Sequence, residues 1–495
     1  MLQRYSAAKR FAALVTMALL PATAAVADAG AEPDLIAAVR AGDAAGARTL
    51  LAAGADVNAP QGDGATALHW AAHRNDLDAA TLLIAAGADV DAANALGATP
   101  LWLAATNGST ALVERLLEAG ADPNVALRMG ETPLMGAARS GSGPVVARLL
   151  AYGADPNRAE RERGQTALMW AAAERHAGVV RHLAAHGGDV HARSRVWHQL
   201  ENTAGNTNPR GNFRMAHGGS TPLLFAARNG DTETARALVA AGADFNDTAA
   251  AGTSALVVAA HSGHGPLATY LLQQGADPNA AGAGYTALHA AILRSDVALA
   301  EALLDHGADV NAAVDRGTPG RRFSADFSIR HQAVGGNAFW LAARYGEVEI
   351  ARLLAERGAD PHVAPGNRVS SLIAAMGVSQ IPQENRRNQV DAPEIDRADM
   401  ERLTLDLASL VLDLGVDVNR RDERGNTALH DAVRTGFASV VELLATHGAD
   451  LDAMNDRGQT PLTLAESRLP IPGTNGLRAT QPELAARLRE LGADD

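Results

Sequence analysis

Residues 63–90 read DGATALHWAAHRNDLDAATLLIAAGADV, and both ends of this segment recur along the chain. The closing tripeptide Gly-Ala-Asp, or a near variant, returns after 33, 33, 33 and 34 residues between Gly54 and Gly187. The opening Thr-Ala-Leu, or Thr-Pro-Leu, keeps step with it. A fixed period of about 33 residues is typical of stacked supersecondary units. We therefore expect a repeat array, rather than one compact core, for the 495 residues.

Each unit predicts a turn, a short helix, a second helix and a hairpin. Gly64 suits a tight turn, and the Thr66 hydroxyl can cap the first free amides of a helix. Paired apolar residues such as Val145 and Val146 give the second helix a core face, and Gly87 supplies a left-handed helix end. We predict an all-α solenoid of about 12 helix-turn-helix units with short hairpin tips.

The unit resembles the ankyrin repeat, because TALH is written out at residues 66–69, 286–289 and 427–430. The resemblance covers residues 34–495, which we predict to be the array. It implies that the motif histidine bonds locally to its turn. Units nine and ten depart from the pattern, since Asn337 and Ser370 replace the opening threonine and make their geometry less certain.

Insertions interrupt the period at four places, residues 191–219, 311–336, 377–399 and 469–481. The first two fall at hairpin tips, and the other two separate the helices of one unit. The tip insertions combine arginine with aromatic residues, which is the composition of a protein interface. We expect them to form two arms of one binding site, with bases about 25–30 Å apart on the same edge. The alternative is that they cover neighbouring repeats or have no fixed structure.

The resemblance also implies that partners bind the hairpin tips and the exposed side of the first helices, on a concave face. Arginine recurs after the Ala-Ala that closes the first helix, although it could simply solvate the helix end. The predicted partner-binding residues are His73, Arg74, Arg139, Trp197, Arg228, His261, Tyr285, Arg321, Arg322, Phe323, Arg344, Tyr345 and Arg434.

Residues 1–27 predict a cleaved signal peptide that resembles a bacterial Sec signal. A basic leader is followed by an apolar run at 11–20 and by small residues that favour cleavage between Ala27 and Asp28. The run is shorter than the roughly 20 residues that span a bilayer. We expect a periplasmic or secreted protein in which residues 28–33 form a short linker before the array.

Composition and motif spacing exclude several chemistries. The chain has no cysteine, which removes disulfides, thiolate metal sites and cysteine nucleophiles. Its net charge of −13 argues against general binding to nucleic acid. His182 and His186 are four residues apart, but no third ligand is assured. We therefore predict no catalytic residues, no metal and no cofactor.

These observations favour a non-enzymatic protein-interaction scaffold outside the cytoplasm. We expect it to bind a protein partner through the concave face and the tip insertions, and to be monomeric otherwise, with no membrane span. One alternative is a periplasmic inhibitor or immunity protein for a toxin or hydrolase. A second alternative is a metal-binding or enzymatic protein that uses the histidines of the insertions.

Overall fold

The computed structural model describes residues 34–202, 212–318, 329–377, 396–470 and 478–494. The predicted signal peptide and linker lie outside these ranges, as do three of the predicted partner-binding residues, Arg321, Arg322 and Phe323. The chain divides into two compact units. The first contains residues up to Trp197 together with Gly218–Asp244, and the second contains His198–His217 together with Phe245–Asp495.

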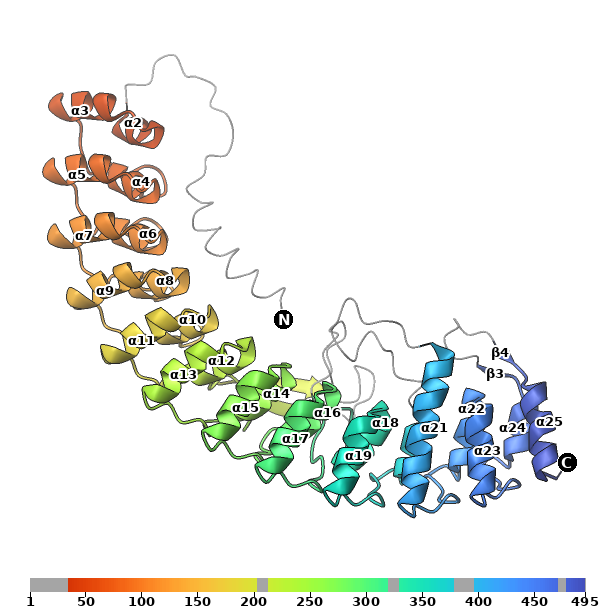
Figure 1. The fold of residues 1–495 in the computed structure, drawn as a ribbon. Coiled ribbons are helices and arrows are strands. Elements are labelled where there is room, and N and C mark those ends of the chain that lie inside the picture. The colour runs from red at the N-terminus through yellow and green to blue at the C-terminus, as the bar shows by residue number, and fades with distance from the viewer. Residues whose placement is uncertain (1–33, 203–211, 319–328, 378–395, 471–477, 495) are drawn as a thin grey trace. The chain divides into compact units, whose positions relative to one another are not determined.

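The first unit contains six helix pairs (Figure 1). First helices contact the first helices of adjacent pairs, and second helices contact second helices, so each pair packs only on its neighbours. The pairs are α2 (Leu35–Ala41) with α3 (Ala44–Ala52), α4 (Ala67–His73) with α5 (Leu77–Ala85), α6 (Pro100–Thr106) with α7 (Thr110–Glu118), α8 (Pro133–Ser140) with α9 (Gly143–Ala151), α10 (Ala167–Ala173) with α11 (Ala177–Ala185), and α12 (Pro222–Asn229) with α13 (Thr232–Ala240).

Six further pairs with the same neighbour contacts make up the second unit, so the predicted helical repeat array is confirmed over the described ranges. They are α14 (Ala255–His261) with α15 (Gly265–Gln273), α16 (Ala287–Leu293) with α17 (Val297–Asp305), α18 (Ala338–Tyr345) with α19 (Val348–Glu356), α20 (Ser371–Ala375) with α21 (Arg397–Asp413), α22 (Ala428–Thr435) with α23 (Ala438–Thr446), and α24 (Pro461–Glu466) with α25 (Pro482–Leu491).

Short strands in two insertions qualify the all-α expectation. Strands β1 (Trp197–Asn202) and β2 (Asn212–His217) form one two-stranded sheet in the first insertion. Strands β3 (Leu469–Pro470) and β4 (Arg478–Ala479) pair antiparallel between α24 and α25. The second insertion contains a 3₁₀ turn, η2 (His331–Ala333). The described residues of these insertions therefore adopt local structure, while the helix pairs on either side remain intact.

Small buried side chains set the close packing of the first helices. The Ala-Ala pairs at Ala71–Ala72 and Ala104–Ala105 are fully buried. Because alanine has no side chain beyond Cβ, neighbouring first helices can approach closely along this row. Larger apolar residues, such as the buried Val145 and Leu149 of α9, fill the space around the second helices.

Polar side chains cap the first helix even where the opening motif is degraded. Thr99 Oγ1 accepts a hydrogen bond from the Trp102 amide at 3.2 Å. In unit nine Asn337 Oδ1 accepts from the Trp340 amide at 2.9 Å, and in unit ten Ser370 Oγ accepts from the Ile373 amide at 3.2 Å. The uncertainty about units nine and ten is resolved, since any short polar side chain can supply this cap.

The motif histidines link each unit to the next one. The Thr286 amide donates to His289 Nδ1 at 3.1 Å, and His289 Nε2 donates to the Ala312 carbonyl at 3.1 Å. Because an amide can only donate, Nδ1 must be the unprotonated nitrogen of a neutral ring. Burial lowers the pKa of His289 to about 4. His69 and His430 make the same bonds, and burial lowers the pKa of both rings.

The lowered pKa of His289 predicts a loss of stability in mild acid. The unfolded ring gains a proton below its ordinary pKa of 6.5, whereas the folded ring resists protonation until about pH 4. The contribution of His289 to the free energy of unfolding is therefore complete above pH 6.5 and falls as the pH drops towards 4. The loss is about 2 kcal/mol between pH 7 and pH 5. Urea unfolding should show that His289→Gln lowers this pH dependence by that amount. Gln274→Ala, at an exposed and non-titrating residue that ends α15, should leave it unchanged.

At several hairpins an asparagine also bonds to the following unit. Asn157 Nδ2 donates to the Gly187 carbonyl at 2.8 Å, and Asn157 Oδ1 accepts from the Asp189 amide at 2.7 Å. The residues that repeat this pair of bonds are Asn58, Asn124, Asn279, Asn311 and Asn419. One amide side chain thus satisfies a donor and an acceptor of its neighbour.

Asp91 occupies the equivalent position between the second and third helix pairs. Its carboxylate accepts from the Asp122 amide at 3.0 Å, but an ionised carboxylate has no hydrogen to donate to the Gly120 carbonyl. Burial raises the pKa of Asp91, and the neighbouring charges of Asp122 and Asp89 raise it further, while the bond from the Asp122 amide opposes the shift. The charged form is therefore disfavoured in the folded chain.

Asp91→Asn should stabilise the array by about 1 kcal/mol at pH 7, because the amide restores the missing donor. A carboxyl whose pKa is raised by folding contributes stability below its unfolded pKa and loses it as the pH rises. The gain from Asp91→Asn should therefore shrink in acid, where the protonated carboxyl also donates. Urea unfolding at pH 7 and in acid measures both effects. The reciprocal change Asn58→Asp should destabilise at pH 7, and a stabilising Asn58→Asp would contradict this assignment.

Candidate partner-binding surface

Side chains near the end of the first helix bond to the preceding unit instead of standing free. Arg74 Nη1 donates to the Arg40 carbonyl at 3.0 Å, at the end of α2. Asn107 Nδ2 donates to the His73 carbonyl at 3.1 Å, at the end of α4. Further examples are the bonds from His176 to the Arg139 carbonyl, from Asn229 to the Ala173 carbonyl and from Arg294 to the His261 carbonyl. These side chains satisfy helix-end carbonyls that would otherwise need water.

Two of the predicted partner-binding arginines lie against aromatic rings. The guanidinium carbon of Arg139 lies 4.8 Å from the centre of a Trp170 ring, and that of Arg228 lies 5.9 Å from the centre of the Phe225 ring. Burial lowers the pKa of Arg139, although the carboxylates of Glu131 and Glu174 oppose the shift. Much of each guanidinium is therefore committed to packing within the array.

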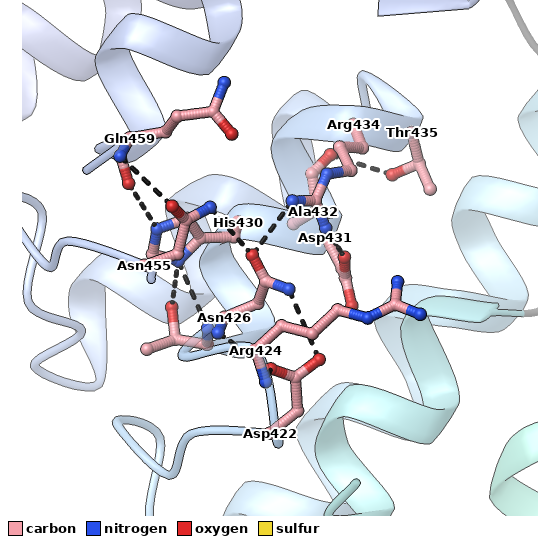
Figure 2. Close-up of polar contacts among 11 residues, drawn as sticks. Asp422, Arg424, Asn426, His430, Asp431, Ala432, Arg434, Thr435, Asn455 and Gln459 are labelled. Carbon is pink, nitrogen blue, oxygen red and sulfur yellow. Dashed lines mark hydrogen bonds and ion pairs between the residues drawn. The ribbon is translucent and has the colours of Figure 1, made fainter. Parts of the chain in front are cut away.

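Arg434 belongs to an internal network that spans α22 and the turn before α24 (Figure 2). It donates to Asp431 Oδ1 at 2.5 Å and to Asn426 Oδ1 at 2.9 Å. Asn426 Oδ1 also accepts from Asn455 Nδ2 at 3.0 Å, which ties this unit to the next one. Burial raises the pKa of Asp431, and the Arg434 charge acts in the opposite direction. Arg344 and Tyr345, at the end of α18, are both half-buried.

Tyr285, a predicted partner-binding residue, does not lie on an exposed face, because only 8% of this residue is accessible. Its ring centre lies 5.7 Å from that of His261, and its hydroxyl lies 3.5 Å from His261 Nδ1. Burial raises the pKa of Tyr285 to about 12. His73 is also only half-exposed, and its ring stands edge-on to Trp70 with centres 5.9 Å apart. The turn before α16 therefore folds Tyr285 inward.

A side chain that caps a neighbouring helix should matter for stability more than an exposed one. Arg294 donates through Nε to the His261 carbonyl at 2.7 Å, and Nη2 bonds to the same oxygen. Arg294→Ala should lower the free energy of unfolding by about 1–2 kcal/mol, because that carbonyl loses its partners. Trp197→Ala should change it by less than about 0.5 kcal/mol. Equal losses in urea unfolding would show that the capping bonds contribute nothing.

The first insertion presents exposed apolar side chains. Accessibility reaches 49% for Val196, 47% for Trp197 and 66% for Leu200. Single exposed apolar residues are ordinary on soluble proteins, but adjacent ones that include tryptophan indicate an interaction surface. Trp197 is therefore a predicted partner-binding residue that the structure leaves accessible.

The second insertion is anchored at its base, and it contacts the first. The Thr318 amide donates to the Ile329 carbonyl at 2.9 Å, and Ile329 is fully buried. The guanidinium carbon of Arg316 lies 5.3 Å from the centre of the Phe213 ring on β2. An aromatic residue of the first insertion therefore lies against an arginine of the second, and whether the two insertions form two arms of one binding site stays a prediction.

Sequence reasoning missed a row of bonded hairpin tips in the first of the two compact units. The Arg128 amide donates to the Leu96 carbonyl at 3.1 Å, the Arg161 amide to the Met129 carbonyl at 2.7 Å, and the Arg195 amide to the Arg163 carbonyl at 2.6 Å. Leu96 is 40% and Met129 42% accessible. The signal was present in the repeat, because Leu96, Met129 and Arg163 each precede the tip glycine of their unit.

Comparisons with known families agree with this architecture. Residues 411–465 match a family described as "Ankyrin repeats (many copies)". The family described as "Ankyrin repeats (3 copies)" matches residues 35–127, 121–194, 200–282, 223–314 and 281–365. The chain belongs to the ankyrin repeat family. Ankyrin repeats are protein–protein interaction modules and are typically non-enzymatic.

Curated relatives share the ankyrin region of this chain. Ankyrin repeat and SOCS box protein 16 of Homo sapiens is 34% identical over 229 residues, covering 43% of this chain and 47% of that protein. Neurogenic locus notch homolog protein 1 of Homo sapiens is 35% identical over 141 residues, covering 26% and 6%. Potassium channel AKT1 of Oryza sativa subsp. indica is 42% identical over 69 residues, covering 14% and 7%. The aligned part spans less than half the length of each of these relatives.

The described residues of the ankyrin array lack two other kinds of feature. None of its helices has both the length and the apolar character needed to cross a bilayer. The same residues contain no group of three or more histidine, aspartate or glutamate side chains placed to hold a metal ion. His182 and His186 stack with ring centres 4.3 Å apart on α11, and His186 Nδ1 donates to the His182 carbonyl at 2.8 Å.

Proposed function

We propose that this ankyrin protein is an exported, non-enzymatic scaffold that binds a protein partner. The contact surface proposed is the row of hairpin tips in the first unit, which ends at the exposed Val196 and Trp197. The observation that carries the proposal is the contrast between two sets of side chains. Arg74, Arg139 and Arg434 are held by internal contacts, whereas Leu96 and the other apolar tip residues are open to solvent.

The non-enzymatic role is proposed from the hydrogen bonds that the buried histidines make. The buried histidines of the described ranges are His69, His289 and His430, and each joins a helix cap to the following unit. A general base must be able to reach a substrate proton, and a fully buried ring with both nitrogens bonded cannot. The interaction role typical of ankyrin repeats supports the same proposal.

Export is proposed from the N-terminal sequence. Basic residues, an apolar run and small residues follow one another over residues 1–27 in the order that signal peptidase substrates show. The absence of cysteine is compatible with an oxidising compartment, where no disulfide needs to form. The proposed location is therefore the periplasm or the extracellular medium.

Expression of the full chain in a Gram-negative host tests both parts of the proposal. The intact mass of the exported protein should correspond to a chain that begins at Asp28, and retention of residues 1–27 would overturn export. Crosslinking in the exported fraction of the source cells should recover one partner in stoichiometric amount. Trp197→Ala should reduce its recovery, while Leu77→Ala, at an exposed leucine on α5, should not. Recovery of no stoichiometric partner would overturn the scaffold role.

A further inference from the structure

We infer that the hairpin tips of the first unit form a binding site for an extended acidic segment that carries apolar side chains at regular intervals. This inference rests on the proposed scaffold function and specifies the chemistry of the partner. The site, which we call the tip ridge, consists of three exposed apolar and three exposed basic residues. They are Leu96, Met129, Trp197, Arg128, Arg163 and Arg195.

Backbone hydrogen bonds fix the order of the tip ridge. The bonds from the Arg128 and Arg161 amides to the carbonyls of Leu96 and Met129 join three successive tips, and the bond from the Arg195 amide to the Arg163 carbonyl adds the next. Because each bond joins one repeat to the next, residues recur along the ridge once per repeat. A spacing of about 8–10 Å between packed helices gives the same distance between tips.

That spacing matches an extended chain. A β-strand advances about 3.3 Å per residue, so successive tips face side chains about three residues apart in an extended partner. A partner with an acidic residue and an apolar residue in each triplet could therefore meet Leu96 at the first tip, Arg128 and Met129 at the second, Arg163 at the third, and Arg195 and Trp197 at the fourth. A helical partner would advance about 1.5 Å per residue and would meet the same tips only every six residues or so.

The charge of the tip ridge differs from that of the whole chain. The chain has a net charge of −13, yet Arg128, Arg163 and Arg195 are exposed on adjacent tips. Among the described residues no acidic side chain forms an ion pair with any of the three. The carboxylate of Glu160 does not neutralise them through such a pair, because it is buried and accepts the amides of Glu162 and Arg163 instead. An acidic partner would therefore be attracted to the ridge and repelled by most other surfaces of the chain.

The apolar members of the tip ridge distinguish a protein segment from a simple polyanion. Between 40% and 47% of Leu96, Met129 and Trp197 is accessible, and this area gains from burial against apolar side chains. A nucleic acid or a sulfated polysaccharide would leave the two aliphatic side chains without such a contact. Tryptophan and arginine are also the residues that most often dominate protein–protein binding energy.

The probe is a fluorescein-labelled peptide of Glu-Leu-Ser triplets, about 12 residues long and therefore about 40 Å when extended. Fluorescence anisotropy with the full exported chain should show saturable binding that weakens as salt is added. A peptide of Glu-Ser-Ser triplets and one of Lys-Leu-Ser triplets should each bind at least about tenfold more weakly. Equal binding of the Glu-Leu-Ser and Glu-Ser-Ser peptides, or displacement by heparin at lower concentration than by unlabelled peptide, would overturn the inference.

Two triple variants with the same change in charge locate the site. The ridge triple variant should weaken peptide binding by at least about tenfold, and it combines Arg128→Glu, Arg163→Glu and Arg195→Glu. The control changes Arg48, Arg181 and Arg352, exposed arginines on the second-helix row, to glutamate and should weaken binding by less than about twofold. Similar losses in both would show general electrostatic attraction and overturn the inference. If the triple variant with glutamate at the ridge positions has an altered circular dichroism spectrum, the variant with Arg128→Gln, Arg163→Gln and Arg195→Gln must also bind the peptide more weakly.

The partner recovered in the exported fraction separates this inference from the proposed function. If the ridge triple variant still captures that partner in stoichiometric amount, the ridge is not its site and the inference is wrong, while the scaffold function stands. If the variant loses the partner and the control triple keeps it, both stand. If the parent chain captures no partner at all, the scaffold function falls, and the inference falls with it.

Discussion

Hydrogen bonds from one helix pair to the pair after it, within each compact unit, are the interactions on which the rest of the array depends. Asn157 satisfies the Gly187 carbonyl and the Asp189 amide of the following unit, and His289 reaches forward to the Ala312 carbonyl. In the other direction, Arg294 caps the first helix of the unit before it. A single pair cannot bury enough apolar surface to be stable alone, so these links and the alanine contacts make neighbouring pairs stabilise one another. The chain therefore has many local interfaces instead of one core.

This arrangement determines which side chains remain for recognition. An arginine at the end of a first helix lies within reach of the carbonyls of the preceding unit, and Arg74 uses that proximity. The hairpin tips bond to one another through their backbone, as Arg128 does with Leu96, and their side chains need not take part. Side chains at the tips can therefore vary without loss of the array. The same physical reason explains why exposed apolar residues such as Met129 are tolerated there.

The sequence contained most of the fold, because the features that define it are local. A threonine cap, a glycine at the helix end and an alanine pair act over a few residues, and their repetition at one period specifies the stacking. Substitution at the cap was harmless for the same reason, since Asn337 bonds to the Trp340 amide as a threonine would. Tyr285 could not be placed from its own segment, because its burial depends on His261 in the preceding unit.

The insertions and the tips show that sequence reasoning does not reveal contacts between distant residues or the exposure of side chains. The contact between Arg316 and Phe213 joins residues about a hundred positions apart, and no periodic signal relates them. The tip ridge, by contrast, repeats with the period of the chain and could have been read by aligning the residues before each tip glycine. What the sequence did not show was their exposure, which follows from the bonds between the tips. The predicted residues and the observed surface therefore overlap at Trp197 and differ along the first-helix row.

The forward direction of the inter-unit bonds has a consequence for synthesis of the chain. Asn124 finds its partners only when Gly153 and Asp155 have been made, and His69 finds the Ala98 carbonyl only when the next hairpin exists. A unit that has just left the ribosome therefore lacks partners for one histidine or one asparagine until about 30 further residues have emerged. Each helix pair becomes complete one repeat behind the growing end. Maturation consequently proceeds in the direction of translation, and an interrupted chain ends in a unit whose forward-facing polar groups have only water to bind.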